Sequence, residues 1–181
     1  MIIDVIIENP LKESVKYEWD EAYNMPRGDR LMTTSMTYPG NYGFIPKTTA
    51  GDGDPIDVLL PIDQKLRLAT IHSCRVIGAL ITRDEACAGP DVFDEKILAI
   101  PTYCKKLNHI KNYTDLDKTQ QDMIKHFFEH YKDNEEHKWV EVQHFVDANA
   151  AAKLITDYRK SADNELSEAD TINNENQHWQ Y

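Results

Sequence analysis

Cysteine pairs and long apolar runs are both absent from this sequence. Its three cysteines, Cys74, Cys87 and Cys104, are an odd number at wide spacings without a Cys-x-x-Cys pair, which is typical of reduced thiols in a cytosolic protein. The longest apolar runs, such as residues 76–81, are far shorter than the roughly 20 residues that a membrane-spanning helix needs. No basic leader or small-residue cleavage site follows Met1. These absences predict a cytoplasmic protein without a membrane span.

Basic residues are also in deficit, because 20 Lys and Arg face 31 Asp and Glu and leave a net charge of -11. General nucleic-acid binding draws most of its affinity from a basic surface, so the sequence predicts no nucleic-acid partner. Part of the negative charge lies in residues 163–181, which hold five acidic residues and no Lys or Arg. This segment lacks apolar periodicity, and we expect a disordered acidic tail. The length of the chain and its 41% hydrophobic composition predict a single domain over residues 1–162.

The two halves of the chain carry different periodicities. Strand-like segments, rich in Val, Ile and aromatic residues, fill the first hundred residues at 2–8, 15–19, 58–60, 71–81 and 96–100. Residues 29–46 alternate too irregularly for one element and are expected to be strand and loop. A helical stripe follows at Met123, Ile124, Phe127, Phe128 and Tyr131. A short strand at 139–142 and a second helix at about 148–160, with Asp147 as N-cap, complete an α+β fold.

An acidic run precedes the apolar strand at 58–60. It places Asp52, Asp54 and Asp57 within six residues, and Pro55 holds Asp54 in an extended conformation. Two negative charges about 4 Å apart repel by roughly 4 kcal/mol at an effective dielectric near 20, so three converging carboxylates indicate a bound cation. Carboxylate oxygens favour Mg²⁺, Mn²⁺ or Ca²⁺ over Zn²⁺. The alternative interpretation is an Asp/Gly/Pro turn that joins two strands.

Two other sequence patterns resemble metal sites. A calcium loop of the EF-hand type needs a ligand at its fifth position and Gly at its sixth, where this chain has Ile56 and Asp57. The helical segment containing His126, Glu129 and His130 matches the H-x-x-E-H pattern of zinc metalloproteases. That pattern needs a third ligand, and few residues remain downstream to supply it. Two histidines on a packed or subunit-facing side of a helix are the plainer interpretation.

The acidic run, written DGDPIDVLL, resembles the signature of the soluble family I inorganic pyrophosphatases, bacterial type. The resemblance continues in the family's order through VIIENP, VKYEWD, DRLMTTSMTYPGNYGFIP, EKILAIP and HFFEHYKD. It implies a small closed antiparallel β-barrel of five strands, OB-like, flanked by two C-terminal helices. The implied activity is hydrolysis of pyrophosphate to two phosphates by a metal-activated water. Several Mg²⁺ ions, replaceable by Mn²⁺ or other divalent ions, and a homo-oligomer, with a hexamer favoured, are also implied.

The same resemblance implies roles for individual residues. The metal ligands would be Asp52, Asp57, Asp84 and Asp94, and Asp57 would bridge two ions. Asp54 would act as the base on the attacking water, so Asp54, Asp57 and Tyr42 form the catalytic set. The substrate-binding set would be Lys16, Arg30, Tyr42, Lys96, Tyr131 and Lys132, whose residue types suit phosphoryl oxygens. Supporting roles fall to Glu8, Glu18 and Tyr38.

One segment departs from the family's pattern. Residues 86–93 lengthen the link between Asp84 and Asp94 by about five residues over the usual bacterial arrangement, which leaves open whether Asp91 or Glu85 replaces one of them as a ligand. Each implied residue also has a plainer interpretation as exposed strand edge or helix core. For the whole chain, the alternative functions are a non-catalytic OB-like barrel that binds nucleotides or oligonucleotides and, less favoured, the zinc metalloprotease.

Overall fold

Strands dominate the architecture. The structure, a computed structural model, describes residues 1–51, 53–87, 89 and 92–159. The strands are β1 (Ile2–Asn9), β2 (Val15–Asp20), β3 (Met25–Leu31), β4 (Asn41–Phe44), β5 (Asp57–Leu60), β6 (Ile71–Asp84), β7 (Asp94–Pro101) and β8 (Val140–Asp147). The helices are the short 3-10 turns η1 (Lys105–Leu107) and η2 (Tyr113–Asp115), then α1 (Lys118–His130) and a C-terminal helix over residues 148–159. Seven strands therefore precede α1, and β8 lies between α1 and the C-terminal helix, as the periodicity predicts.

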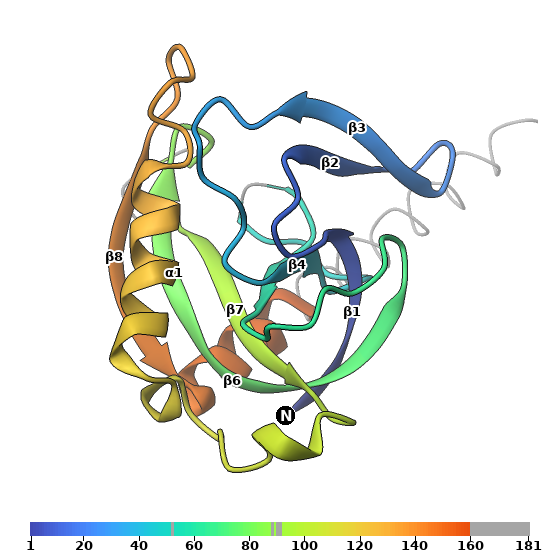
Figure 1. Cartoon of the computed structure of the whole chain (residues 1–181), viewed down its shortest axis with the longest axis vertical. Helices are drawn as coiled ribbons and strands as arrows, with labels where there is room; N and C mark the ends of the chain where they lie inside the picture. The colour runs from blue at the N-terminus through green and yellow to red at the C-terminus, as the bar shows by residue number, and fades with distance from the viewer. Residues whose placement is uncertain (52, 88, 90–91, 160–181) are drawn as a thin grey trace, which may run out of the picture.

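Six strands form one sheet in the order β1-β4-β5-β7-β6-β8, and β1 also pairs with β6. The pairings of β1, β4, β5, β7 and β6 thus close into a ring, to which β8 adds on β6. A separate two-stranded sheet, β2 and β3, lies beyond this ring (Figure 1).

The expectation of a purely antiparallel arrangement is wrong at one pair. Strands β5 and β7 run parallel, with Val58 beside Ile97 and Leu59 beside Leu98. The reason is the connection: the chain leaves β5 through residues 61–70, enters β6, and returns antiparallel as β7. Strand β7 therefore lies between β5 and β6 and shares the direction of β5.

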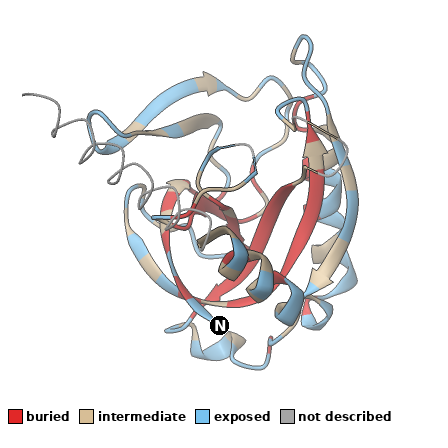
Figure 2. Cartoon of the chain, turned by 180° about the vertical axis from the view of Figure 1, so that it is seen from behind, coloured by how far each residue is buried: buried red, intermediate tan, exposed pale blue. Residues whose placement is uncertain are grey.

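The two helices cover opposite sides of the sheet because the strand residues alternate between two cores. On β7, Ile97 and Ala99 belong to a core closed by Ala151 and Ile155 of the C-terminal helix. Leu98 belongs to the other core, which includes residues 124, 127 and 128 of α1. In Figure 1 α1 lies in front of β6 and β8, and from behind in Figure 2 the C-terminal helix lies in front of the buried strands. Two-sided burial explains the near-continuous apolar run in β7.

Both helices begin at aspartates. The Asp117 carboxylate accepts a hydrogen bond from the Gln120 amide at 2.8 Å, which caps α1. Asp147 accepts bonds from the amides of Asn149 and Ala150 at 2.9 and 2.8 Å. The predicted N-cap is therefore confirmed. Within the described residues, no helix is long and apolar enough to cross a membrane.

Strands β3 and β4 were the elements that the sequence pattern obscured. Pro26 and Gly28 interrupt β3, which tolerates them because it is mostly exposed and pairs with β2 alone. Strand β4 has only four residues, all buried, so no alternation of polar and apolar positions marks it. The predicted tail, residues 163–181, lies outside the described residues, so the boundary at 162 stays a prediction.

Candidate active site

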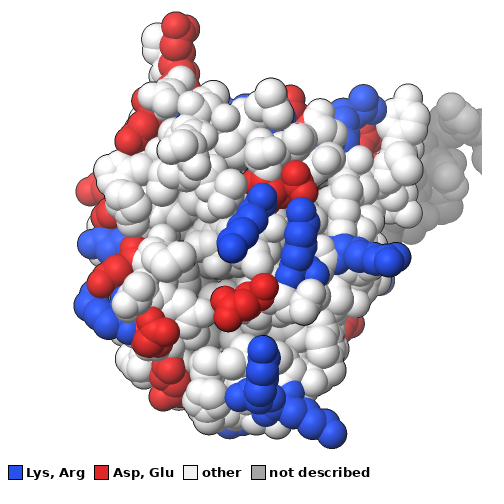
Figure 3. All heavy atoms as spheres, viewed as in Figure 1, with Lys and Arg blue, Asp and Glu red and all other residues white. Residues whose placement is uncertain are grey.

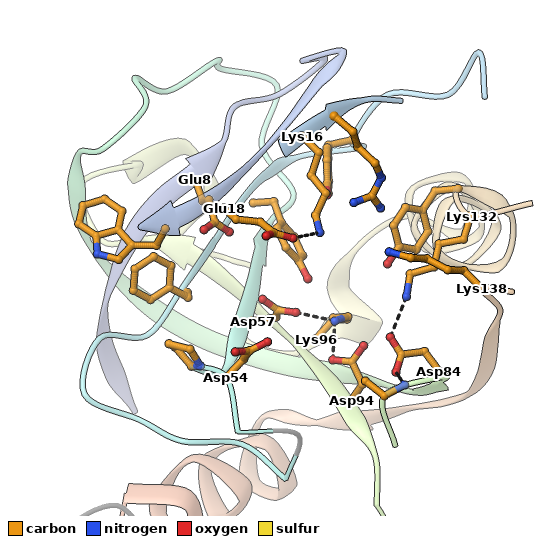
Figure 4. A pocket seen from close by; sticks show the side chains of 18 of the residues that line it. Glu8, Lys16, Glu18, Asp54, Asp57, Asp84, Asp94, Lys96, Lys132 and Lys138 are labelled. Atoms are coloured by element: carbon orange, nitrogen blue, oxygen red, sulfur yellow. Dashed lines mark hydrogen bonds and ion pairs between the residues drawn. The ribbon is translucent and has the colours of Figure 1, made fainter. Parts of the chain in front are cut away.

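A cavity of about 330 Å³ opens where β5 and β7 begin and β6 ends. We call it the acidic pocket. Acidic, basic and aromatic side chains converge on it from most of the chain (Figure 4). Every predicted site residue that the structure describes lines the pocket: Glu8, Lys16, Glu18, Arg30, Tyr38, Tyr42, Asp54, Asp57, Asp84, Asp94, Lys96, Tyr131 and Lys132. Two residues, Asp52 and the alternative ligand Asp91, lie outside the described residues.

The parallel pairing of β5 and β7 builds the centre of the pocket. It sets the first residue of β5, Asp57, beside Lys96 near the start of β7. Asp94 lies two residues before Lys96, so both side chains point to the same face of the strand. The Lys96 ammonium donates to Asp57 Oδ2 and to Asp94 Oδ1, each at 2.5 Å (Figure 4). Two carboxylates from strands far apart in sequence thus share one cation.

Burial makes this cluster electrostatically demanding. Lys96 is only 4% exposed and Asp94 only 8%. Burial alone would lower the pKa of Lys96, but Asp57 and Asp94 outweigh it and raise that pKa well above its ordinary value. Burial raises the pKa of Asp94 to about 6, although the Lys96 charge opposes the shift. The ammonium stays charged, and the two carboxylates depend on it or on another cation for neutralisation.

A second ion-pair group lies on the α1 side of the pocket. Asp84 ends β6 and Lys132 follows the last turn of α1, so the two elements meet in a 2.8 Å contact between Lys132 Nζ and Asp84 Oδ2. Lys132 also donates to Glu85 at 3.0 Å. Burial would raise the pKa of Asp84, but hydrogen bonding to Lys132 is the main opposing effect and the pKa is lowered. Asp84 is therefore ionised and oriented.

Carboxylates also approach from β1 and β2. Glu18 accepts a hydrogen bond from Lys16 at 2.7 Å. Both residues lie on β2, where they are two positions apart and so share one face of the strand. Glu8 lies near the end of β1, and burial, followed by the charge of Asp57, raises its pKa from 4.5 to about 8. The Lys16 charge opposes this shift without cancelling it, so a cation bound nearby would favour the ionised form of Glu8.

Arg30 reaches the pocket through a contact that the sequence pattern did not indicate. Its guanidinium donates from Nε and Nη2 to Glu135 Oε1 at 3.0 and 2.9 Å, and it also pairs with Asp29. Glu135 lies 3.5 Å from Lys138 Nζ, and Lys138 itself lines the pocket. Neither Glu135 nor Lys138 belongs to the predicted set. They lie in a loop after α1, where single charged residues carry no periodic signal.

Three tyrosines line the wall nearest α1. Tyr38 and Tyr42 lie with ring centroids 5.0 Å apart, and Tyr131 stacks on Phe127 at 5.1 Å. Burial raises the pKa of Tyr131 to about 12 and those of Tyr38 and Tyr42 well above the ordinary value. All three hydroxyl groups are therefore protonated at neutral pH and able to donate hydrogen bonds to an anion.

The acidic run turns sharply before it enters β5. Gly53 has a φ of 95°, in the left-handed region that favours glycine, and Asp54 and Pro55 follow it along the pocket rim. Among the described residues of the run, Asp54 is exposed at the edge of the pocket, whereas Asp57 is half-buried and contacts the buried Lys96. The two carboxylates thus occupy different environments despite their short separation in sequence.

The donor set of the pocket fits a hard divalent cation. Its carboxylate oxygens come from Asp57, Asp84 and Asp94 in the centre and from Glu8 and Asp54 nearby. The Lys96 ammonium already lies between two of these carboxylates, Asp57 and Asp94. Their negative charge would likewise attract an added metal cation. All-oxygen donors favour Mg²⁺ or Mn²⁺.

Acidic and basic side chains lie next to one another on the face that Figure 3 shows, and the described residues there form no broad basic area. A surface of this kind gives little non-specific attraction to a nucleic-acid backbone. The face thus resembles the pocket in mixing both charges.

Comparison with known proteins identifies the relatives of this chain. The inorganic pyrophosphatase family model matches residues 5–163. The chain belongs to the inorganic pyrophosphatase family. It is 44% identical to the inorganic pyrophosphatase of Rickettsia prowazekii over 84% of this chain and 88% of that protein. It is 41% identical to that of Mesorhizobium japonicum over 86% of each chain.

A solved structure agrees with the sequence relatives. The inorganic pyrophosphatase of Helicobacter pylori superposes with a TM-score of 0.83 at 35% identity, covering 90% of this chain and 94% of that one. The predicted function of this pyrophosphatase, hydrolysis of pyrophosphate to two phosphates, is therefore confirmed at the level of the family. The two alternatives, oligonucleotide binding and peptide hydrolysis, gain no support from the comparisons.

Proposed function

We propose that the acidic pocket hydrolyses pyrophosphate by in-line attack of a water molecule on one phosphorus atom, assisted by divalent metal ions. The observation that carries this proposal is the Asp57–Lys96–Asp94 cluster, with its 2.5 Å contacts in a buried setting. Such a cluster places negative charge where metals are held and positive charge where phosphate is held. Pyrophosphate hydrolysis requires both at one point.

Asp57, Asp84 and Asp94, with Asp52 from outside the described residues, would hold several Mg²⁺ ions, and Mn²⁺ or other divalent ions could replace them. When bound, these ions supply an acidic water and neutralise the phosphate oxygens. Glu8 and Glu18 would support this set from β1 and β2. The raised pKa of Glu8 indicates that its carboxylate is poorly neutralised, and a bound metal ion would supply the missing positive charge. Glu85, held by Lys132, remains a candidate to share the role of Asp84.

The residues of the chain divide the remaining work. Asp54, at the exposed edge, accepts the proton of the attacking water. The new bond joins water oxygen to phosphorus, the bond from that phosphorus to the bridging oxygen breaks, and the second phosphate leaves with the electron pair. Cationic groups and tyrosine hydroxyls would stabilise the negative charge that develops on the phosphate oxygens. These substrate-binding residues are Lys16, Arg30, Tyr42, Lys96, Tyr131 and Lys132. Tyr38, next to Tyr42, would support them.

Phosphate release from pyrophosphate by purified protein, with and without Mg²⁺, tests the proposal. We expect turnover that depends on a divalent ion and disappears on chelation. Folded protein that fails to release phosphate with either Mg²⁺ or Mn²⁺ would contradict it. Titration with labelled single-stranded oligonucleotide at low salt, where no binding is expected, separates the enzyme from the oligonucleotide-binding alternative.

We further propose that the ring of five strands is a small OB-like barrel and that residues 1–162 form one domain. The closed set of pairings through β1 and β6 supports the first point. A cytoplasmic location is proposed because all three cysteines are free thiols.

The protein is also proposed to be a homo-oligomer, with a hexamer favoured. Exposed large apolar residues on neighbouring strands support an association surface, since Ile2 of β1 is 55% exposed and Ile71 of β6 is 65% exposed. Sedimentation velocity of the full chain tests this, and a monomer at all concentrations would contradict it.

A further inference from the structure

Asn9, the last residue of β1, is a fully buried polar residue that does not line the acidic pocket. Both polar atoms of its side chain bond to the backbone of one residue of β2. Asn9 Nδ2 donates to the Tyr17 carbonyl oxygen at 3.0 Å, and Asn9 Oδ1 accepts from the Tyr17 amide at 2.7 Å. The side chain therefore acts like a strand partner, because it satisfies both backbone groups of Tyr17.

Tyr17 lies between two residues of the pocket. Lys16 and Glu18 flank it on β2, and the Lys16 ammonium donates to Glu18 at 2.7 Å. Figure 4 shows both side chains directed toward the pocket, with Glu8 of β1 nearby. Successive side chains of a strand point to opposite faces, so a fixed backbone at Tyr17 sets the direction of both of its neighbours.

Asn9 also follows an irregularity in β1. Ile7 pairs with Gly43 of β4 and Asn9 pairs with the next residue back, Tyr42, so Glu8 is one extra residue in β1. A bulge of this kind changes the direction of a side chain, and Glu8 lines the pocket. Because Asn9 directly follows the bulge, its bonds to Tyr17 fix the position of β2 relative to Glu8.

The sheet that contains β2 depends on contacts of this kind. Within the part of the chain that the structure describes, β2 and β3 pair with each other and not with the six-stranded sheet. Side chains supply connections that strand pairing does not. Asn9 holds the β2 side through two bonds, and the Arg30 contact with Glu135 holds the β3 side at 2.9 Å.

We propose that Asn9 is a positioning residue for pyrophosphate hydrolysis: through the Tyr17 backbone it sets Lys16 and Glu18 in the acidic pocket. This inference rests on the proposed function, in which Lys16 binds the substrate. An apolar residue of similar size at position 9 would fill the space but leave the amide and carbonyl of Tyr17 without these two bonds. A displacement of about 1 Å in a substrate-binding group can reduce the rate about 100-fold.

Steady-state phosphate release by Asn9→Leu in the full chain tests the proposal. We expect KM for pyrophosphate to rise by about 10- to 100-fold while kcat stays within about threefold of the wild type, because the displaced Lys16 binds substrate. The control is Arg75→Met. Half-buried Arg75 donates to the carbonyl oxygens of Leu107 and Ile110 at 3.2 and 2.8 Å and does not line the pocket. Its loss should lower Tm but leave KM unchanged. An equal rise of KM in both variants, or in neither, would overturn the proposal.

The double variant Asn9→Leu/Lys16→Ala shows whether Asn9 acts through its neighbour on β2. Residues that act through one contact give non-additive effects, so Asn9→Leu should raise KM much less in the Lys16→Ala background than in the wild type. The same factor in both backgrounds would contradict the positioning role.

A binding measurement separates this inference from the proposed function. Calorimetric titration with imidodiphosphate and Mg²⁺ reports affinity without turnover, since the P–N–P bridge resists hydrolysis. Wild-type protein that binds this analogue but releases no phosphate from pyrophosphate would contradict the proposed function alone. Equal dissociation constants for the wild type and Asn9→Leu would contradict the role of Asn9 alone. If Asn9→Leu fails to fold, as judged by thermal unfolding, Asn9→Ala removes the same two bonds without adding bulk, and a wild-type KM in that variant would overturn the proposal.

Discussion

The acidic pocket and the group of His126, Glu129 and His130 on α1 are assembled differently, although two pocket residues, Tyr131 and Lys132, directly follow His130. The pocket takes Asp57, Asp94 and Lys96 from two strands that meet only through the parallel pairing of β5 and β7. The group of His126, Glu129 and His130 takes its three side chains from a span of five residues on one helix. One arrangement is long-range and buried, and the other is local and exposed.

Burial accounts for the chemical difference. In the pocket, Lys96 and Asp94 are buried and Asp57 is half-buried, so water solvates the two carboxylates poorly and Lys96 neutralises part of their charge. On the helix, His130 contacts Asp133 at 2.9 Å, but both side chains are largely exposed, so this contact contributes little to stability. The long-range arrangement thus brings opposite charges together away from water, whereas the groups on one helix stay in contact with it.

The largest expected effect is that of Asp57→Asn. The amide removes the charge that Lys96 and the proposed metal ions share, so we expect a loss of pyrophosphatase kcat of about 1,000-fold or more. The matched control is Asp63→Asn, an exposed aspartate shortly after β5, which should leave the rate near that of the wild type. Steady-state phosphate release measures both. An Asp57→Asn protein that keeps most of its rate would refute the central role of this carboxylate.

Arg30→Ala should act mainly on substrate handling. A hydrogen bond to a charged group contributes about 1.5–3 kcal/mol, so kcat/KM should fall by about 10- to 150-fold, chiefly through KM. Arg27→Ala, an exposed residue of the same strand that pairs with Asp20, serves as the control. If the two variants gave equal kcat/KM values, Arg30 would have no part in substrate binding.

Glu135→Gln tests whether the loop after α1 positions Arg30. The amide keeps the shape but weakens the contact with the guanidinium, so we expect a smaller rise in KM than in Arg30→Ala, of about 3- to 10-fold. In Arg30→Ala/Glu135→Gln the second substitution should add little, because both act through one contact. Glu136→Gln, its exposed neighbour, is the control. Fully additive effects in the double variant would mean that Glu135 acts independently of Arg30.

Glu8 should give the metal-free protein a distinctive pH dependence. Its pKa rises from 4.5 to about 8 on folding, so its stabilising contribution is complete below pH 4.5 and is lost as the pH rises through about 8. The Tm of the wild type should therefore fall more over this window than that of Glu8→Gln, and Mg²⁺ should reduce the difference. Glu21→Gln, exposed after β2, should follow the wild type. Parallel Tm profiles for the wild type and Glu8→Gln would exclude the effect.

The smallest expected effect on catalysis is that of His126→Ala/His130→Ala. Exposed substitutions change free energies by about 0.5 kcal/mol or less, so the rate at saturating Mg²⁺ should stay within about twofold of the wild type. A large loss of rate would show that His126 and His130 form one functional unit with the acidic pocket.

Much of this protein could be predicted from local patterns. The stripe of Phe127 and Phe128 identified α1, Asp147 identified the start of the C-terminal helix, and the acidic run marked the rim of the pocket. Each signal lies within a few residues because helix periodicity, capping and turn chemistry are local effects. Most of the site residues came from resemblance to a family rather than from such patterns. Lys138 and Glu135 had neither kind of signal.

The sequence by itself determined the strand-to-helix order, the deficit of basic charge, the capped helices and the spacing of His126, Glu129 and His130. The tertiary structure alone decided that β7 lies between β5 and β6 and runs parallel to β5, which sets Lys96 between Asp57 and Asp94. It also decided that Glu135 holds Arg30 across 105 positions of the chain. The physical reason is range: local patterns fix neighbours on one element, whereas burial and strand pairing select which distant charges must share one pocket.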